Sequence, residues 1–162
     1  MGSSSPPDRY PPRDAPAGTV WSGGPVDEAK VTLRVYGDEI DPLEVTRLLG
    51  CSPSQSARTG ETITNSSGIT RTVREGFWRL SSGRSDLDIE DQVTILLTQL
   101  TSDLTVWRDL TRRFRVDLFC GLFLNASNRG FDFGPSVLRQ LADRGISIGF
   151  DIYGPEFPDE AA

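Results

Sequence analysis

Apolar and polar residues alternate along three segments of the chain, residues 31–36, 116–125 and 146–153. A period of two predicts strands that bury one face each. The middle segment differs, because it carries apolar residues on both of its faces. We therefore expect residues 116–125 to form a central strand that is covered on both sides, either by other elements or by the N-terminal tail.

A hairpin is predicted in the middle of the chain. Residues 70–81 form a strand whose apolar residues gather near its end, and a weaker strand is expected near residues 62–64. The turn-forming residues 65–68, Asn-Ser-Ser-Gly, separate the two.

Helices are predicted where apolar residues recur every three or four positions. The first begins after the capping residue Asp41 and ends at Gly50. The longest covers residues 89–104 and bends near residues 101–103 before a second segment. A short helix follows at residues 135–141.

The predicted order is β-α-β-β-α-β-α-β, which indicates an α+β fold. Helices pack on a mostly antiparallel sheet, and the first six elements are ferredoxin-like. Residues 1–28 are rich in Pro, Ser and Gly and predict a disordered tail, since they bury too little surface to offset ordering. Residues 29–155 are expected to form a single domain, and residues 156–162 a frayed acidic tail.

Charge and hydropathy narrow the list of partners. The chain has 17 basic and 23 acidic residues, a net charge of −6. A negative protein repels phosphates, so no nucleic acid is expected as a partner, and no membrane either. The sequence has neither an apolar run long enough for a membrane span nor the pattern of a secretory signal. We therefore expect a cytoplasmic protein.

The absence of histidine restricts the chemistry more than any other feature of the composition. It excludes a Ser-His-Asp triad, a Cys-His pair and histidine-ligated metal sites. The two cysteines, Cys51 and Cys120, make neither a disulfide framework nor a metal site. We accordingly expect no catalytic residues, no metal and no cofactor, and the balance leans against an enzyme without deciding the question.

Five segments together resemble a known family. They are Gly37-Asp38-Glu39-Ile40-Asp41-Pro42 into a helix ending Leu48-Leu49-Gly50; Arg58-Thr59-Gly60-Glu61; Gly76-Phe77-Trp78-Arg79-Leu80; the strand end at Asn125; and Ile148-Gly149-Phe150-Asp151-Ile152-Tyr153. In order and spacing they are similar to the uncharacterised bacterial family named domain of unknown function 4279, over about residues 30–155. The resemblance implies small stand-alone cytoplasmic proteins with no established activity, some of them immunity proteins that neutralise a toxin.

Candidate ligand-binding residues are Asp151, Tyr153, Asn125, Arg58 and Trp78. A carboxylate beside a phenol, with an amide nearby, binds a cation or transfers a proton. An arginine in a loop binds a carboxylate, and a tryptophan is favoured at binding surfaces. Each also has a structural interpretation, as a hydrogen-bonded strand end, a surface ion pair or a core residue.

Two functional hypotheses follow. The first is a non-enzymatic protein-interaction module, specifically an immunity-type binder of a toxin. The alternative is a small-molecule or ion-binding module, or a histidine-free enzyme, that uses Asp151, Tyr153, Asn125 and Arg58. Convergence of those four side chains on one pocket favours the alternative, and their dispersal favours the interaction module.

Overall fold

The computed structural model of the protein describes residues 24–126 and 128–154. The predicted C-terminal tail and residues 1–23 of the predicted N-terminal tail lie outside the described residues.

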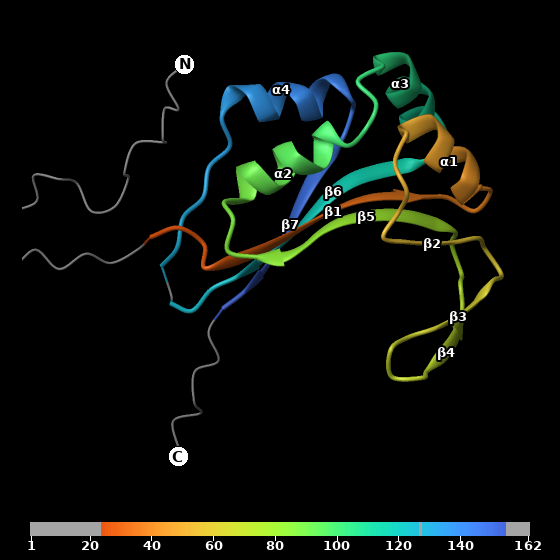
Figure 1. The fold of residues 1–162 in the computed structure, drawn as a ribbon, viewed down its shortest axis with the longest axis horizontal. Coiled ribbons are helices and arrows are strands. Elements are labelled where there is room, and N and C mark those ends of the chain that lie inside the picture. The colour runs from red at the N-terminus through yellow and green to blue at the C-terminus, as the bar shows by residue number, and fades with distance from the viewer. Residues whose placement is uncertain (1–23, 127, 155–162) are drawn as a thin grey trace, which may run out of the picture.

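A five-stranded sheet forms one layer of the molecule (Figure 1). Its strands, in spatial order, are β2 (Gln55–Ala57), β5 (Phe77–Ser85), β1 (Glu28–Tyr36), β6 (Arg115–Phe123) and β7 (Ser147–Tyr153). All neighbours are antiparallel except β6 and β7, which run parallel. The predicted α+β fold with a mostly antiparallel sheet is confirmed; the ferredoxin-like order of the first six elements stays a prediction.

The predicted hairpin forms a separate small sheet. Strands β3 (Thr62–Thr64) and β4 (Thr70–Thr72) pair antiparallel and project below the main sheet (Figure 1). At its turn, the side chain of Asn65 accepts hydrogen bonds from the backbone N–H groups of Ser67 and Ile69, at 3.0 and 2.8 Å. Asparagine favours such turns because its side chain bonds the backbone locally.

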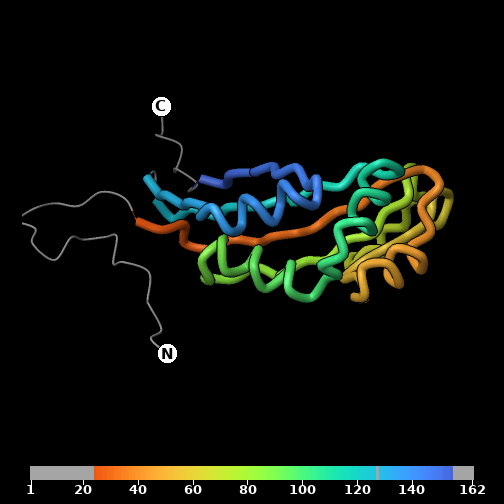
Figure 2. Tube along the Cα trace, turned by 90° about the horizontal axis from the view of Figure 1, so that it is seen from above, coloured from red at the N-terminus to blue at the C-terminus, as the bar shows by residue number. Residues whose placement is uncertain are grey.

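The four helices of the described residues cover the same face of the main sheet, as Figures 1 and 2 show. They are α1 (Pro42–Leu49), α2 (Ile89–Thr98), α3 (Leu104–Arg113) and α4 (Pro135–Asp143). Between the helices and the sheet lies the core, where Leu33, Trp78, Trp107 and Leu118 are fully buried. Across the described residues, no helix is both long and apolar enough to cross a membrane.

One predicted strand is divided in the structure, and the bend predicted near residues 101–103 is a break between two helices. The strand predicted over 70–81 is two strands, β4 and β5, and β5 continues through Gly83 to Ser85. The long helix ends at Thr98, and α3 starts six residues later. The linker is fixed because the Thr101 N–H donates to the carbonyl of Leu49 at 2.9 Å and the Thr101 carbonyl accepts from Trp107 Nε1 at 2.8 Å.

Within the described residues, other elements cover residues 116–125 on one side only, and the predicted alternative, cover by the N-terminal tail, lies outside the described residues. Helices cover the face of β6 that carries Leu118 and Cys120. No described helix lies over the other face, where Phe119 and Phe123 are half-buried. Among the described residues, arginine side chains lie over these two rings.

Candidate binding face

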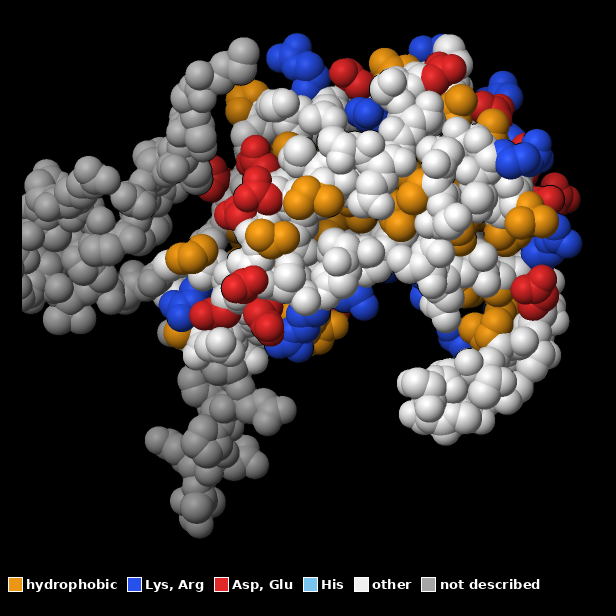
Figure 3. Space-filling view, in the orientation of Figure 1, with side chains coloured by type: hydrophobic (Ala, Val, Ile, Leu, Met, Phe, Trp, Pro, Cys, Tyr) orange, Lys and Arg blue, Asp and Glu red, His pale blue; other side chains and the backbone are white. Residues whose placement is uncertain are grey.

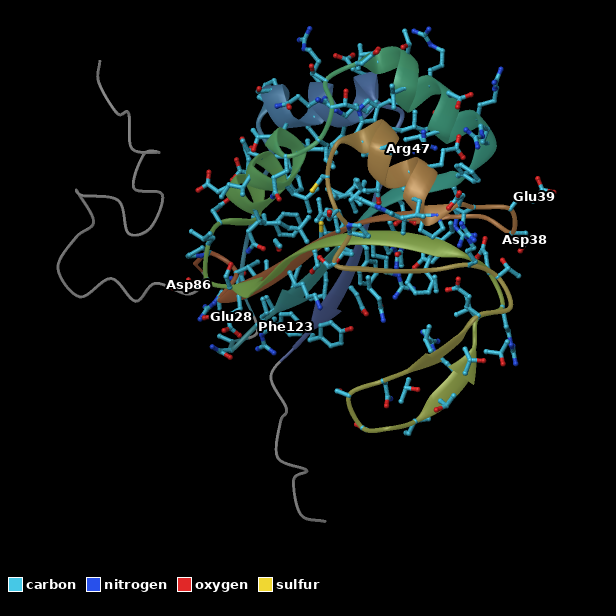
Figure 4. All side chains as sticks on the ribbon, turned by 45° about the vertical axis from the view of Figure 1, so that its right-hand side comes forward. Glu28, Asp38, Glu39, Arg47, Asp86 and Phe123 are labelled. Atoms are coloured by element: carbon cyan, nitrogen blue, oxygen red, sulfur yellow. The ribbon has the colours of Figure 1, made fainter. Side chains whose placement is uncertain are left out.

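The side of the main sheet that faces away from the helices is here called the open face. Strand alternation and register place on it residues from four strands: Lys30, Thr32, Arg34 and Tyr36 of β1; Phe77, Arg79, Ser81 and Arg84 of β5; Arg115, Asp117, Phe119, Gly121 and Phe123 of β6; and Asp151 and Tyr153 of β7. Figure 4 shows Phe123 on this side, beside Glu28 at one end of the strands. The open face therefore combines aromatic rings with cations.

Guanidinium groups lie over the rings. The Arg84 Cζ is 3.8 Å from the centroid of the Phe123 ring, and the Arg34 Cζ is 4.3 Å from that of Phe119. The Arg79 Cζ is 4.3 Å from the ring of Phe77. Cation–π contacts of this kind hold the flat guanidinium groups in fixed positions on the sheet.

Most of these arginines are also neutralised by carboxylates. Arg34 donates to both oxygens of Asp117, at 2.6 and 3.1 Å. Arg84 pairs with Glu28, and Arg115 pairs with Glu75 at 3.0 Å. Two carboxylate bonds hold the Arg34 guanidinium in one plane, which is the geometry that favours a strong ion pair.

Arg79 is the exception. It is half-buried, and within the part of the chain that the structure describes it has no carboxylate partner. Its Nε is buried and has no hydrogen-bond partner there. A buried donor without a partner costs about 1–3 kcal/mol. The Arg79 guanidinium is thus held in place by rings, while its Nε–H has no partner among the described residues.

Two hollows meet at Arg79. One, of about 620 Å³, lies over the middle of the open face between Ser54 and Tyr153. The other, of about 600 Å³, lies against the β4–β5 connection and Arg71. Arg79 and Tyr36 line both hollows. Figure 3 shows the concave side of the molecule, where the β3–β4 hairpin curves beneath the sheet.

Asp151 and Tyr153, predicted as a site, lie together at the β7 side of this face. The Tyr153 hydroxyl donates to Asp151 Oδ2 at 2.6 Å, and its ring stacks on Phe123 at 4.9 Å between centroids, 9° from parallel. The hydrogen bond to Asp151, the negative charge of that residue and desolvation together raise the pKa of Tyr153. The phenol therefore keeps its proton at neutral pH.

This pairing predicts a shift in tyrosine ionisation. In an ultraviolet pH titration, the part of the absorbance change that disappears in Tyr153→Phe reports the ionisation of Tyr153. We expect the midpoint of that part to lie above the ordinary tyrosine pKa of about 10. Asp151→Asn removes the negative charge and is expected to bring that midpoint back toward the ordinary value. Ultraviolet titration of the wild type and both variants measures it. An unshifted Tyr153 midpoint in the wild type contradicts the pairing.

The other predicted site residues lie elsewhere. Arg58 is exposed and bonds Asp41, the capping residue of α1, at 2.7 Å; this bond lowers the pKa of the Asp41 carboxyl. The Asn125 backbone N–H donates to Asp27 Oδ2 at 2.8 Å, beyond the end of β6. Trp78 faces the helices and is fully buried. The four residues of the alternative hypothesis, Arg58 included, do not converge on one pocket.

Of the two cysteines, Cys120 is buried and Cys51 is half-buried. Burial raises the pKa of the Cys120 thiol to about 12. Cys51 follows Gly50, the C-cap of α1, and its thiol donates to the carbonyl of Ser52 at 3.5 Å. Among the described residues, no group of three carboxylate or thiol side chains is placed to hold a metal ion.

Sequence reasoning alone does not find Arg79, Arg34 and Tyr36 as a group. The available signal is alternation: Arg34 and Tyr36 share a face of β1, and Arg79 lies on the face of β5 opposite to Trp78. What joins them is the pairing of β1 with β5, which places Arg34 directly across from Arg79.

Comparison with known proteins gives one match. The family model for a domain of unknown function, DUF4279, matches residues 27–155, so the chain belongs to that family. The match confirms the family resemblance seen in the sequence. No curated protein and no solved structure matches significantly.

Proposed function

We propose that this protein is a non-enzymatic interaction module that binds a protein partner on the open face of its sheet. The observation that carries the proposal is Arg79, a half-buried guanidinium without a carboxylate partner among the described residues, at the junction of two hollows. A carboxylate from the partner would supply the hydrogen bonds that Arg79 lacks. Arg79 is then the charged anchor of the interface.

The surroundings of Arg79 support a protein partner. Arginine and aromatic residues are enriched at the centres of protein interfaces, and the open face is composed of both. Its side chains are also ordered before binding, since Arg34 and Arg84 are each held by a ring and a carboxylate. Pre-ordering lowers the entropic cost of association.

The charge of the open face favours a protein partner over a nucleic acid. Asp117, Glu28 and Glu75 already neutralise three of the arginines on or beside the open face. Within the described residues this leaves Arg79 and the exposed Lys30 as the unpaired cations of the face. Arg71 and Arg74, which line the adjoining hollow, also have no ion pair among the described residues. Even four such cations release fewer counterions from a phosphate backbone than a typical nucleic-acid interface, and the net charge of −6 opposes such binding. A local carboxylate on a folded partner fits better.

The finer form of this proposal is an immunity-type role in the cytoplasm, in which the partner is a toxin. The family resemblance suggests this role, and the open face sets its chemistry: the toxin would present an acidic patch rather than a basic one. If a toxin gene lies beside this gene, expressing the toxin and this protein in the same cells tests the proposal. Cells that survive the toxin with the wild-type protein but not with Arg79→Ala support it, and cells that survive with both contradict it.

A capture experiment with matched variants tests the main proposal. The full chain serves as bait in extracts of its native host, and quantitative mass spectrometry compares wild type with Arg79→Ala. We expect specific partners to fall roughly ten-fold or more with Arg79→Ala, the loss typical of a buried interface anchor. Arg108→Ala is the control, because Arg108 is an exposed arginine on α3, across the sheet from the open face. Equal capture by wild type and Arg79→Ala overturns the proposal.

A further inference from the structure

Among the described residues, strand β7 is an edge strand of the main sheet. It pairs with β6 on one side only, and Figure 2 shows no described element along its outer side. The Leu124 N–H donates to the Tyr153 carbonyl at 2.8 Å, so the backbone groups of Tyr153 point toward β6. Because these directions alternate along a strand, the N–H and C=O groups of Ile148, Phe150 and Ile152 point outward.

The same edge is apolar. The exposed fractions of Phe150 and Ile152 are 39 % and 59 %. Phe131 and Phe133 extend the patch on the helix side, with ring centroids 5.0 and 6.3 Å from that of Phe150. Natural edge strands are normally protected by lysine, proline or a bulge. The sequence of β7, Ser-Ile-Gly-Phe-Asp-Ile-Tyr, has one charged residue, Asp151, and no lysine or proline, and its pairing with β6 runs without a register shift.

We propose that two copies of the chain pair through β7 to form one continuous sheet. The strand is self-complementary when a two-fold axis passes through Phe150. Antiparallel pairing then places Phe150 opposite Phe150 of the second copy, and Ile148 opposite Ile152. These are the residues whose backbone groups point outward, so every outward donor among them meets an acceptor.

Side chains on both faces agree with this register. On the helix side, the apolar residues of the two copies form one row that continues the Phe131–Phe133 patch. On the open face, Asp151 lies opposite Gly149 and Ser147 lies opposite Tyr153, so no two like charges face each other. A second copy of the chain is therefore the occupant that the edge fits. The pairing does not depend on the proposed function.

The oligomeric state is the first test. Sedimentation of the full chain across the micromolar range is expected to give the mass of two chains. Ile152→Lys places a charge in the interface and should shift the protein to the mass of one chain. Leu43→Lys is the matched control, because Leu43 is 68 % exposed on α1, and it should remain a dimer. A monomeric wild type overturns the proposal, as does a dimer that Ile152→Lys leaves intact.

Cysteine cross-linking tests the register. In a Cys51→Ser background, with Cys120 fully buried, Phe150→Cys should form an intermolecular disulfide, since the paired Cα atoms would lie about 5.5 Å apart. Ile148→Cys alone should not, because its two copies would be about 13 Å apart along the strands. The double variant Ile148→Cys, Ile152→Cys should cross-link again. Cross-linking of Ile148→Cys alone, with none for Phe150→Cys, contradicts this register.

Discussion

Trp78→Ala is expected to lower the free energy of unfolding by roughly 3–5 kcal/mol, the usual cost of deleting a buried aromatic side chain. The Trp78 side chain is fully buried between the sheet and α1. Its Nε1 also donates to Thr46 Oγ1 of α1 at 3.0 Å, so the indole fixes the helix to β5 both by packing and by a hydrogen bond. Alanine leaves a cavity that the surrounding core fills only in part.

Urea denaturation followed by far-ultraviolet circular dichroism measures this effect. Trp78→Phe keeps most of the ring and loses the bond to Thr46, so about 1–2 kcal/mol is expected. The control is the adjacent Arg79→Ala, on the opposite face, for which we expect a change below about 1 kcal/mol. A Trp78→Ala variant as stable as the wild type but unable to capture the partner would restore Trp78 as a binding residue.

Local signals predicted those elements whose ends are set by local chemistry. The helix α1 begins and ends as predicted, because the Asp41 side chain accepts from the Leu43 N–H and Gly50 adopts the left-handed conformation, with φ of 73°, that glycine favours. The hairpin turn at Asn65 follows equally local hydrogen bonds. Nothing outside the segment is needed to place either boundary.

Elements that depend on distant contacts were missed or were predicted only in part. The strand β2 carries no alternation over its three residues and exists because it pairs with β5. The break between α2 and α3 is stabilised by the carbonyl of Leu49, which lies far from Thr101 in the chain. Leu104, predicted on a buried helical face, is 38 % exposed at the start of α3.

The candidate site also depends on contacts between segments that are distant in the chain. Alternation places Trp78 and Arg79 on opposite faces, but the sequence does not say which face the helices cover. The hollow at Arg79 takes its lining from several strands, and their order in the sheet differs from their order in the chain. Asp151 and Tyr153 lie together as predicted because both belong to one strand.

Gln92 is a buried polar residue that the hydrophobic pattern does not predict. It lies on the apolar side of α2, where the helical spacing predicts only hydrophobic neighbours, and it is 2 % exposed. Its Nε2 donates to the carbonyls of Ala29 at 3.2 Å and Leu87 at 2.9 Å. Its Oε1 accepts from the Ser82 hydroxyl at 2.7 Å. One side chain thus joins α2 to both β1 and β5.

We expect Gln92→Leu, which nearly conserves volume, to lower the free energy of unfolding by roughly 2–3 kcal/mol. The carbonyls of Ala29 and Leu87 lose their side-chain donor, and the Ser82 hydroxyl keeps only the Gly83 carbonyl as an acceptor. Gln99→Leu is the matched control, since Gln99 is exposed at the end of the same helix, and it should stay within about 0.5 kcal/mol of the wild type. Equal effects of the two substitutions would contradict a structural role for Gln92.

Gln92→Glu separates the hydrogen bonds from packing, because the shape is kept while both amide donors are replaced by oxygen. When ionised, the introduced carboxylate would face the carbonyls of Ala29 and Leu87 and would be disfavoured in the buried site. The folded-state pKa of the new carboxyl would therefore lie above the unfolded value of about 4.3. The free energy of unfolding of Gln92→Glu, relative to the wild type, should be highest below the unfolded-state pKa of about 4.3, where the acid is neutral in both states. It should fall as the pH rises through the folded-state pKa. Urea denaturation of both proteins at several pH values measures this, and a difference that stays constant with pH would show that position 92 is open to water.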